Sequence, residues 1–351
     1  MIASLASEAK DLMLHLVQIA DQTTRRVALV DEPHLRCLTG ITSIYDLAQR
    51  SIRDSRPLTE LARTLATGES LSYDDVYAGR SPWRLLPPID IPGAPSRTLV
   101  AGTGLTHLGS AKERQAMHEA AAAKKAEPTT ITDSMRMFQW GVEAGRPARG
   151  QVGIAPEWFY KGDGSMLRAP FEALEIPGHA EDGGEEAEIA GVYLIGDDGT
   201  PHRIGMAIGN EFSDHKFERR NYLNLAGSKL RTCSIGPELV VDPEFHDVRG
   251  EVRIERDGAT LWHKSIVTGE ENMCHSLANL EHHHFKFSGH RQPGNIHVHF
   301  MGADALSFGD AIELRDSDWM DVRFDGFGRS LRNPVAVLPA VQAPVTVQAM
   351  T

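Results

Sequence analysis

The feature that most constrains the fold is a succession of short strand-like segments in the second half of the chain, with few helical patterns between them. These segments are rich in apolar and β-branched residues, and turns containing Gly, Asp or Pro separate them. The expected strands are Glu186–Ile195, Arg203–Asn210, Glu238–Val241, Glu251–Arg256, Ala259–Lys264, Asn295–Met301, Ala311–Arg315 and Val322–Phe324, with one helix at about Glu270–His283. Many strands and few helices predict an α+β, β-rich sandwich or roll rather than a parallel α/β sheet.

The first ninety-odd residues have the pattern of a small, separate α+β lobe. Strands are expected at residues 12–20 and 26–30, and helices at 41–52 and 58–65. The segment Pro87–Pro95 then carries four prolines in nine residues, which excludes regular structure throughout it. A strand is expected at 97–101 and a helix at 110–125. We predict a small N-terminal domain over residues 1–95 and a larger domain over 96–351.

Charge and cysteine content limit the partners and the compartment. Acidic residues outnumber basic ones and give a net charge of −12, which argues against nucleic acid or an anionic membrane as the main partner. Cys37, Cys233 and Cys274 are far apart, a spacing typical of reduced thiols. The apolar stretch at 12–20 is too short to span a membrane, and no export signal precedes it. We expect a soluble, cytoplasmic protein.

Three glutamates converge if the predicted hairpin forms. Glu186 and Glu188 project from one face of their strand, because side chains two residues apart point the same way. The turn Gly196–Gly199 should fold the chain back so that Glu211 lies opposite residue 184 or 185. Glu211 would then lie within about 7 Å of Glu186, the reach of diagonal neighbours across two strands.

Three converging carboxylates repel one another unless a cation neutralises them. An all-oxygen set suits Mg2+, with Mn2+ or Ca2+ as alternatives, and leaves positions open for water and substrate oxygens. Ala207 and Gly209 are small and lie on the Glu211 face, which leaves room for a ligand. On these residues alone, a solvated strand face is an equal alternative to a metal site.

Five short motifs occur in an order that resembles the fumarylacetoacetate hydrolase superfamily. They are Pro156–Lys161 (PEWFYK), Glu186–Ala190 (EAEIA), Gly205–Ser213 (GMAIGNEFS), Lys229 before Ile235-Gly236-Pro237, and Leu331–Val335 (LRNPV). Gly102–Met117 (GTGLTHLGSAKERQAM) is similar to the sugar-acid branch, whose enzymes dehydrate 2-keto-3-deoxypentonates to 2-ketoglutarate semialdehyde. The resemblance covers about residues 97–336. It implies a mixed β-sandwich or roll of the superfamily's C-terminal type, a small N-terminal α+β domain, and a homodimer.

Carried over by position, the resemblance makes Glu186, Glu188 and Glu211 the metal ligands, with Glu211 standing where Asp is usual. Lys229 matches a substrate-side lysine, and Lys161 matches a second lysine that we include among the substrate-binding residues. The implied reaction is Mg2+-dependent dehydration of a small 2-keto sugar acid in pentose catabolism, through an enolate that the metal stabilises. Lys229 is either the base, neutral because it is partly buried near a cation, or a charged clamp on the substrate carboxylate.

One departure from the superfamily pattern bears on the type of reaction. Its carbon–carbon hydrolases carry a His-x-x-Glu pair that activates water, whereas this chain has Ser110 at the His position and keeps Glu113. An incomplete pair favours elimination and leaves Ser110 and Glu113 as candidates for proton transfer or hydroxyl contact. Two other functions stay open: a Mg2+-dependent hydrolase that cleaves a C–C bond of a diketo acid such as an acylpyruvate, and a non-catalytic keto-acid-binding module.

Seven histidines fall between His275 and His299. The run His282–His284 is expected at the solvated end of the predicted helix. His297 and His299 would share one face of a strand, an arrangement that suits Zn2+. His299 is also a candidate for the substrate pocket, because the superfamily has a Thr-Gly-Thr-Pro turn near this position, where this chain has Phe300–Ala303.

Overall fold

Two β-sheets form the framework of the protein, which the computed structural model describes over residues 13–109, 111–112, 132–340 and 343–350. The strands of the larger, 13-stranded sheet are β1 (Leu14–Ala20), β2 (Arg25–Asp31), β3 (His34–Cys37), β4 (Ser70–Ser72), β5 (Arg84–Leu85), β6 (Thr98–Gly104), β7 (Glu157–Asp163), β8 (Leu167–Arg168), β10 (Ala187–Ile195), β11 (Pro201–Asn210), β12 (Cys233–Ile235), β13 (Leu239–Val241) and β16 (Ile296–Phe300). Those of the smaller sheet are β9 (Leu174–Ile176), β14 (Val248–Arg256), β15 (Ala259–Thr268), β17 (Trp319–Phe324) and β18 (Leu331–Val337).

Helices are few and mostly short. They are α2 (Ile44–Arg53), α3 (Leu58–Leu65), α4 (Tyr73–Tyr77), α6 (Asp133–Ala144), α7 (His215–Arg220), α8 (Leu225–Ser228) and α9 (Leu277–Phe285), with 3-10 turns η1 (Pro95–Arg97), η2 (Gly164–Met166), η3 (Tyr222–Asn224), η4 (Ser288–Arg291) and η5 (Ser307–Asp310). Both sheets combine antiparallel pairs with a few parallel ones, such as β16 with β6 and β18 with β9. The predicted α+β, β-rich fold with mixed sheets is confirmed.

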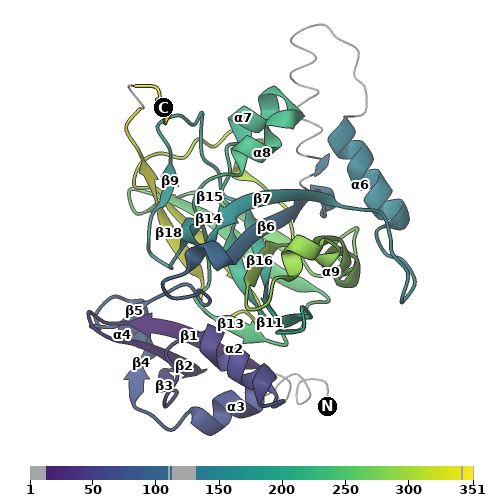
Figure 1. Ribbon diagram of the computed structural model, residues 1–351. Coiled ribbons are helices and arrows are strands. Elements are labelled where there is room, and N and C mark those ends of the chain that lie inside the picture. Colours follow the sequence, from purple (N-terminus) through teal and green to yellow (C-terminus); the bar gives the residue numbers. More distant parts are fainter. Residues whose placement is uncertain (1–12, 110, 113–131, 341–342, 351) are drawn as a thin grey trace, which may run out of the picture.

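The N-terminal lobe joins the rest of the molecule through the larger sheet. The path of this sheet is β4-β3-β2-β1-β13-β11-β10-β16-β6-β7, and β1 pairs with β13 from Leu14 opposite Val241 to Leu16 opposite Leu239. Strands β1 to β4 with α2 and α3 lie at the bottom of Figure 1. The larger sheet therefore contains strands from both sides of residue 95, and the domain boundary expected there stays a prediction.

The β10–β11 hairpin forms as predicted, but its register differs from the expected one. Pairing shifts by one residue between Val192 and Tyr193, and Ala187 then lies opposite Asn210. Glu211 N donates to Glu186 O at 3.0 Å, so Glu211 lies opposite Glu186 itself rather than residue 184 or 185. A β-bulge, which the residue types did not reveal, causes this shift.

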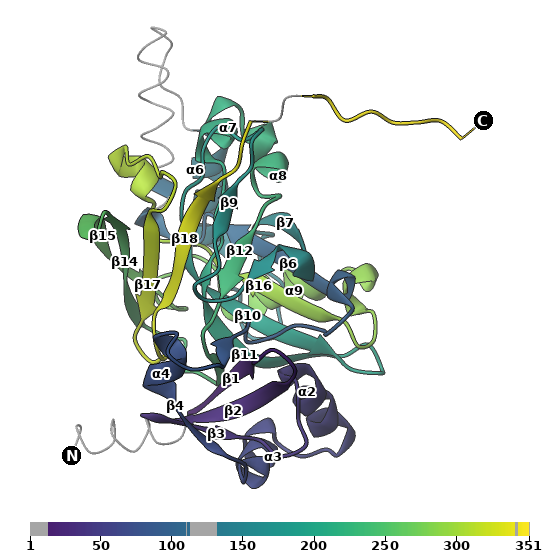
Figure 2. The same ribbon diagram turned by 90° about the vertical axis from the view of Figure 1, so that its left-hand side faces the viewer.

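Alternation along the strands gives the larger sheet two different faces. On one side of β10, Ala190 and Val192 pack against Val298 and Phe300 of β16 and against α2; because Glu188 points to this side, we call it the glutamate face. On the other side, Ile189 and Tyr193 of β10 pack against α9 and the smaller sheet. This side also carries His297 and His299, and we call it the histidine face. Figure 2 shows the smaller sheet standing beside the larger one.

Three sequence expectations are wrong. Ala311–Arg315 is not a strand, because Ala311 ends η5 with a left-handed φ of 58°. The helix expected from Glu270 begins only at Leu277, where Ser276 Oγ caps it by accepting from Asn279 N. The end of this helix is not solvated, since His283 and His284 are buried.

The space beside the small residues on the Glu211 face also differs from expectation. A Cβ at Gly209 would lie 2.5 Å from the Phe300 ring, so the space beside this glycine is filled by an aromatic side chain rather than left for a ligand. Ala207 is buried in the core of the same face. The helix expected at 110–125 lies almost entirely outside the described residues.

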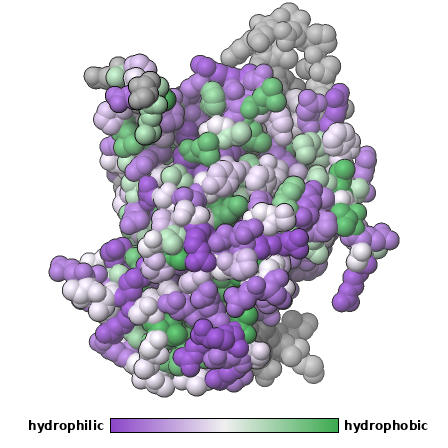
Figure 3. All heavy atoms as spheres, viewed as in Figure 1, coloured by the Kyte–Doolittle hydropathy of each residue, from purple (hydrophilic) through white to green (hydrophobic). Residues whose placement is uncertain are grey.

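Among the described helices, none has the length and apolar character needed to cross a bilayer. On the face drawn in Figure 3, apolar side chains form small patches between polar ones.

Candidate metal centre

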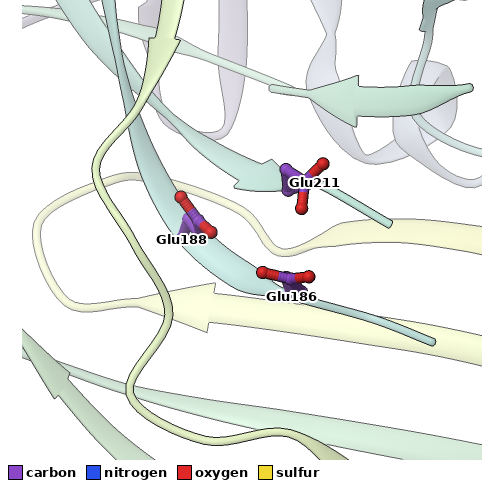
Figure 4. Close-up of side chains that lie close together, drawn as sticks. All are labelled: Glu186, Glu188 and Glu211. Carbon is purple, nitrogen blue, oxygen red and sulfur yellow. The ribbon is translucent and has the colours of Figure 1, made fainter. Parts of the chain in front are cut away.

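Three carboxylates meet at the open end of the β10–β11 hairpin (Figure 4). Glu188 lies in β10, Glu186 comes just before this strand, and Glu211 directly follows β11. One oxygen of each lies within 4.8 Å of the others, and all three side chains are buried. The predicted convergence is confirmed, and a solvated strand face is excluded.

Lys229 lies between two of these glutamates. It follows α8, and its Nζ donates to Glu186 Oε1 at 2.5 Å and to Glu211 Oε2 at 2.6 Å. The ring of Phe159 in β7 is centred 4.5 Å from the same Nζ. Burial alone would lower the pKa of Lys229, but the negative charges of Glu186 and Glu211 outweigh it and raise the pKa. Among these carboxylates Lys229 is an ammonium, which favours the charged role over the neutral base.

Lys161 in β7 is fully buried behind Glu211. Its Nζ donates to the carbonyl oxygens of Phe212 at 2.5 Å and Lys229 at 2.8 Å, and it lies 2.7 Å from Glu211 Oε1. Burial lowers the pKa of Lys161, and the charge of Glu211 partly offsets this effect. Because these three oxygens all belong to the protein, the arrangement favours a supporting role for Lys161 over the predicted contact with substrate.

The surroundings of the glutamates fit a hard divalent cation. Glu188 Oε2 accepts from Gly302 N at 2.6 Å, while burial and the charges of Glu186 and Glu211 raise the pKa of Glu188 well above its usual range. Glu211 Oε1 is buried and accepts no hydrogen bond of good geometry from the described residues. The raised pKa of Glu188 reflects the repulsion between neighbouring carboxylates, which a bound cation would relieve. This all-oxygen donor set suits Mg2+, Mn2+ or Ca2+.

The structure adds His215 to this group. The residue opens α7, is buried, and places Nε2 3.1 Å from Glu186 Oε1. Its ring packs against the ring of Phe308, with centroids 5.2 Å apart. Sequence reasoning missed His215, and only its position four residues after Glu211 could have pointed to it.

A fourth buried carboxylate, Glu157, lies on the glutamate face. Glu157, Phe159 and Lys161 alternate along β7, and the Tyr222 hydroxyl donates to Glu157 Oε2 at 2.7 Å. A Cβ at Gly104 would collide with Glu157 Oε1, so this glycine makes room for the carboxylate. Glu157 stands in the PEWFYK motif, and the period of two along that motif could have grouped it with Lys161.

His299 lies on the opposite face of the sheet. The register of β10 and β16 places it opposite Gly191, and residues that pair directly share a face. Glu188 is three residues from Gly191 and therefore points to the other side. His299 Nε2 lies 2.8 Å from Thr103 Oγ1. The prediction that His299 lines the substrate pocket beside the glutamates is wrong.

His299 belongs instead to a cluster with the buried His284 and His297 and the partly exposed His290. Trp158 Nε1 donates to His284 Nδ1 at 3.1 Å, and His284 Nε2 lies 2.9 Å from His297 Nδ1. Burial lowers the pKa of His297 and of His299 to about 3, and it lowers that of His284 as well. These rings are neutral at pH 7. Within the described ranges, the glutamate group alone brings three ligand atoms close enough for a metal, so a zinc site here has no support.

Two predicted site residues, Ser110 and Glu113, lie outside the described residues. Between residues 109 and 132, only Ala111 and Lys112 are described. The roles of Ser110 and Glu113 in proton transfer or substrate contact stay predictions.

Solved structures with the same fold include a dehydratase, a hydrolase and an isomerase. A 2-keto-3-deoxy-D-arabinonate dehydratase complexed with magnesium and 2,5-dioxopentanoate matches with a TM-score of 0.67 at 16% identity, over 93% of this chain and 99% of that chain. A fumarylacetoacetate hydrolase from Exiguobacterium antarcticum matches with a TM-score of 0.58 at 18% identity, over 93% of this chain and 100% of that chain. A 5-carboxymethyl-2-hydroxymuconate delta-isomerase from Mycobacterium smegmatis has a TM-score of 0.54 at 16% identity, over 92% and 100% of the two chains.

No family model matches the chain, and no curated protein matches it. At 16–18% identity the likeness to solved structures shows the fold alone. The resemblance to the fumarylacetoacetate hydrolase superfamily is confirmed at that level: the chain has the fold that the motifs implied.

Proposed function

We propose that this protein is a divalent-metal-dependent hydro-lyase that converts a 2-keto-3-deoxypentonate into 2-ketoglutarate semialdehyde, also called 2,5-dioxopentanoate. The observation that carries the proposal is the buried group of Glu186, Glu188 and Glu211 with Lys229 between two of them. A solved structure of the same fold is named as a dehydratase holding magnesium and 2,5-dioxopentanoate. The homodimer, the cytoplasmic location and the place in pentose catabolism stay parts of this proposal.

The three glutamates are the proposed ligands, and Mg2+ is the proposed ion, with Mn2+ or Ca2+ as alternatives. A bound divalent cation would supply a Lewis acid for the 2-keto group of the substrate. The substitution of Glu for Asp at position 211 lengthens the side chain by one methylene. Lys161 and Ser213 hold this longer side chain, since Lys161 Nζ lies 2.7 Å from Oε1 and Ser213 Oγ donates to Oε2 at 2.7 Å.

The reaction removes a proton from C3 and the hydroxyl from C4, which leaves as water. A proton then moves from C5 to C3 to give the C4–C5 enol, and transfer of the enol hydroxyl proton to C4 gives the aldehyde. Lys229 enters this scheme as an ammonium, which can bind the substrate carboxylate or protonate the leaving hydroxyl. Glu157 is a further candidate for proton transfer, because it lies buried on the same face with a hydrogen bond from Tyr222. Ser110 and Glu113 remain proposed contacts of the substrate hydroxyls.

The experiment that tests the proposal offers two substrates in parallel. Purified protein with Mg2+ is given a 2-keto-3-deoxypentonate and, separately, an acylpyruvate, and products are followed by NMR. Formation of the semialdehyde with loss of activity in EDTA supports the proposal. Release of pyruvate from the acylpyruvate overturns it in favour of the hydrolase. Binding of either compound without turnover overturns it in favour of a keto-acid-binding module.

A further inference from the structure

We infer that His215 is a positioning residue of the metal centre, whose Nε2–H holds one oxygen of Glu186 so that the other oxygen is presented to the cation. The inference rests on the proposed metal site and assigns a role to a residue that the proposed reaction does not use. It concerns metal affinity, which is measured without any substrate.

The two oxygens of Glu186 have different surroundings. Oε1 lies 3.1 Å from His215 Nε2 and accepts from Lys229 Nζ at 2.5 Å. Both hydrogen bonds go to Oε1, and Oε2 accepts none from the residues that the structure describes. A glutamate side chain would otherwise rotate about its terminal bonds. The two donors therefore determine which oxygen faces the protein and which remains for a ligand.

The imidazole cannot easily turn away from Glu186. A Cβ at Gly184 would lie 2.3 Å from His215 Nδ1, so the ring fills the space that this glycine leaves. Phe308 packs on the ring, and Gly184 itself is fixed by a pair of backbone hydrogen bonds with Ser213 at 2.9 and 3.0 Å. Nδ1 is buried and has no hydrogen-bond partner among the described residues. The polar contact that the ring makes within the described chain is the one to Glu186.

The other two glutamates are held without an imidazole. Glu188 accepts from the backbone N–H of Gly302, and Glu211 accepts from Ser213 and Lys229. Loss of the His215 donor therefore loosens one proposed ligand of three and removes none. Substitution of a residue that hydrogen-bonds to a metal ligand, without binding the metal itself, typically weakens metal binding by roughly 10- to 100-fold.

A matched pair of amide substitutions separates the hydrogen bond from the packing. In His215→Gln the amide nitrogen can reach the position of Nε2, whereas in His215→Asn the same group ends near the position of Nδ1. Binding of Mg2+ and of Mn2+ alone is measured by calorimetry for wild type and both variants. His297→Gln, which removes a buried histidine from the opposite face, is the control.

We expect His215→Asn to bind either metal roughly 10- to 100-fold more weakly than wild type. Affinity of His215→Gln should stay within about threefold of wild type, because the hydrogen bond is restored, and that of His297→Gln should be unchanged. Thermal unfolding without metal checks that each variant folds. If His215→Asn does not fold, Gly184→Ala should give the same loss of affinity, because its Cβ would displace the ring.

Two results overturn the inference while leaving the metal site in place: equal affinity of His215→Asn and wild type, or equal weakening in His215→Asn and His215→Gln. A wild-type protein that binds neither metal overturns both the inference and the proposed function. If the Asn and Gln variants differ as expected but no pentonate is converted, only the proposed reaction fails.

Discussion

The two faces of the larger sheet bury titratable side chains in opposite electrostatic states. The glutamate face holds charged groups in direct contact, in particular the ammonium of Lys229 between Glu186 and Glu211. The histidine face holds neutral imidazoles, with His284 between Trp158 and His297. Both sets are buried to a similar degree. Burial alone therefore does not decide whether a group is charged.

The neighbouring residues of each buried group decide whether that group is charged. The charges of two carboxylates outweigh burial at Lys229 and raise its pKa, whereas burial and a neighbouring histidine lower the pKa of His297 to about 3. Strand β7 contributes to both environments, because Phe159 contacts Lys229 on one side and Trp158 donates to His284 on the other. One strand thus contributes to a site of charged groups and, one residue away, to a layer of neutral rings on the other side of the sheet.

The largest expected effect comes from removing a charge from the glutamate face. Lys161→Met leaves Glu211 Oε1 and two buried carbonyl groups without their ammonium partner. We expect the free energy of unfolding to fall by about 3–5 kcal/mol, measured by urea denaturation. Lys216→Met is the matched control, because Lys216 is a partly exposed lysine paired with Glu313, and its loss should cost less than about 1 kcal/mol. Similar losses in the two variants would contradict the difference between buried and exposed pairs.

Removal of one crowded carboxylate should affect metal binding more than stability. Glu188→Gln keeps the shape of the side chain but removes a charge that burial and two neighbouring glutamates disfavour. We expect Mg2+ affinity to drop by more than about 100-fold, since a ligand should matter more than its outer partners. The unfolding temperature without metal should stay the same or rise. His299→Gln on the opposite face should keep the affinity of wild type; a large loss there would show that the two faces are not independent.

The histidine face should make stability depend on pH. His299 has a folded pKa of about 3 against an ordinary value of 6.5, so the unfolded chain binds the extra proton between these values. Its stabilising contribution is complete above about pH 6.5 and is lost progressively as the pH falls toward about 3. In His299→Gln, the free energy of unfolding should therefore fall by about 2 kcal/mol less than in wild type between about pH 6 and about pH 4.5. Urea denaturation at the two pH values tests this, and equal losses would mean that His299 is not buried as a neutral ring.

The smallest expected effect concerns the hydrogen bond between Trp158 and His284 on the histidine face. Trp158→Phe removes the donor to His284 Nδ1 while keeping an aromatic ring. We expect a loss of about 1 kcal/mol in the free energy of unfolding, with unchanged Mg2+ affinity. Tyr160→Phe, at an exposed position on the same side of β7, is the control and should change neither quantity. A loss of metal affinity in Trp158→Phe would contradict the separation of the two faces.

Local patterns predicted much of the fold. Apolar runs and the Gly- and Asp-containing turns between them correctly indicated two hairpins, β10–β11 and β14–β15, because these signals lie within the paired segments. The bulge near Val192 shifted the register by one residue, and no residue type marks it. Strands β7 and β18, of seven residues each, and the three-residue β9 and β12 were not predicted.

Site residues that belong to one hairpin could be predicted from the sequence, whereas those that reach the site through long-range contacts could not. Glu186, Glu188 and Glu211 belong to one hairpin, so strand geometry could bring them together. Lys161 and His215 reach the site through long-range packing that only tertiary structure supplies. His299 was misplaced because its face depends on the pairing of β16 with β10, which the sequence of β16 alone does not determine.

The pairing of β1 with β13 has a consequence for how the molecule resists aggregation. Without β1, the backbone of Leu239, Val240 and Val241 would form an uncovered apolar sheet edge, a template for other chains to add on. β1 covers this edge, and β2, β3 and the short β4 continue the sheet to a strand of only three residues. The N-terminal lobe, which supplies none of the proposed ligands, thus covers this edge, and we expect a fragment that lacks residues 1–95 to aggregate through it.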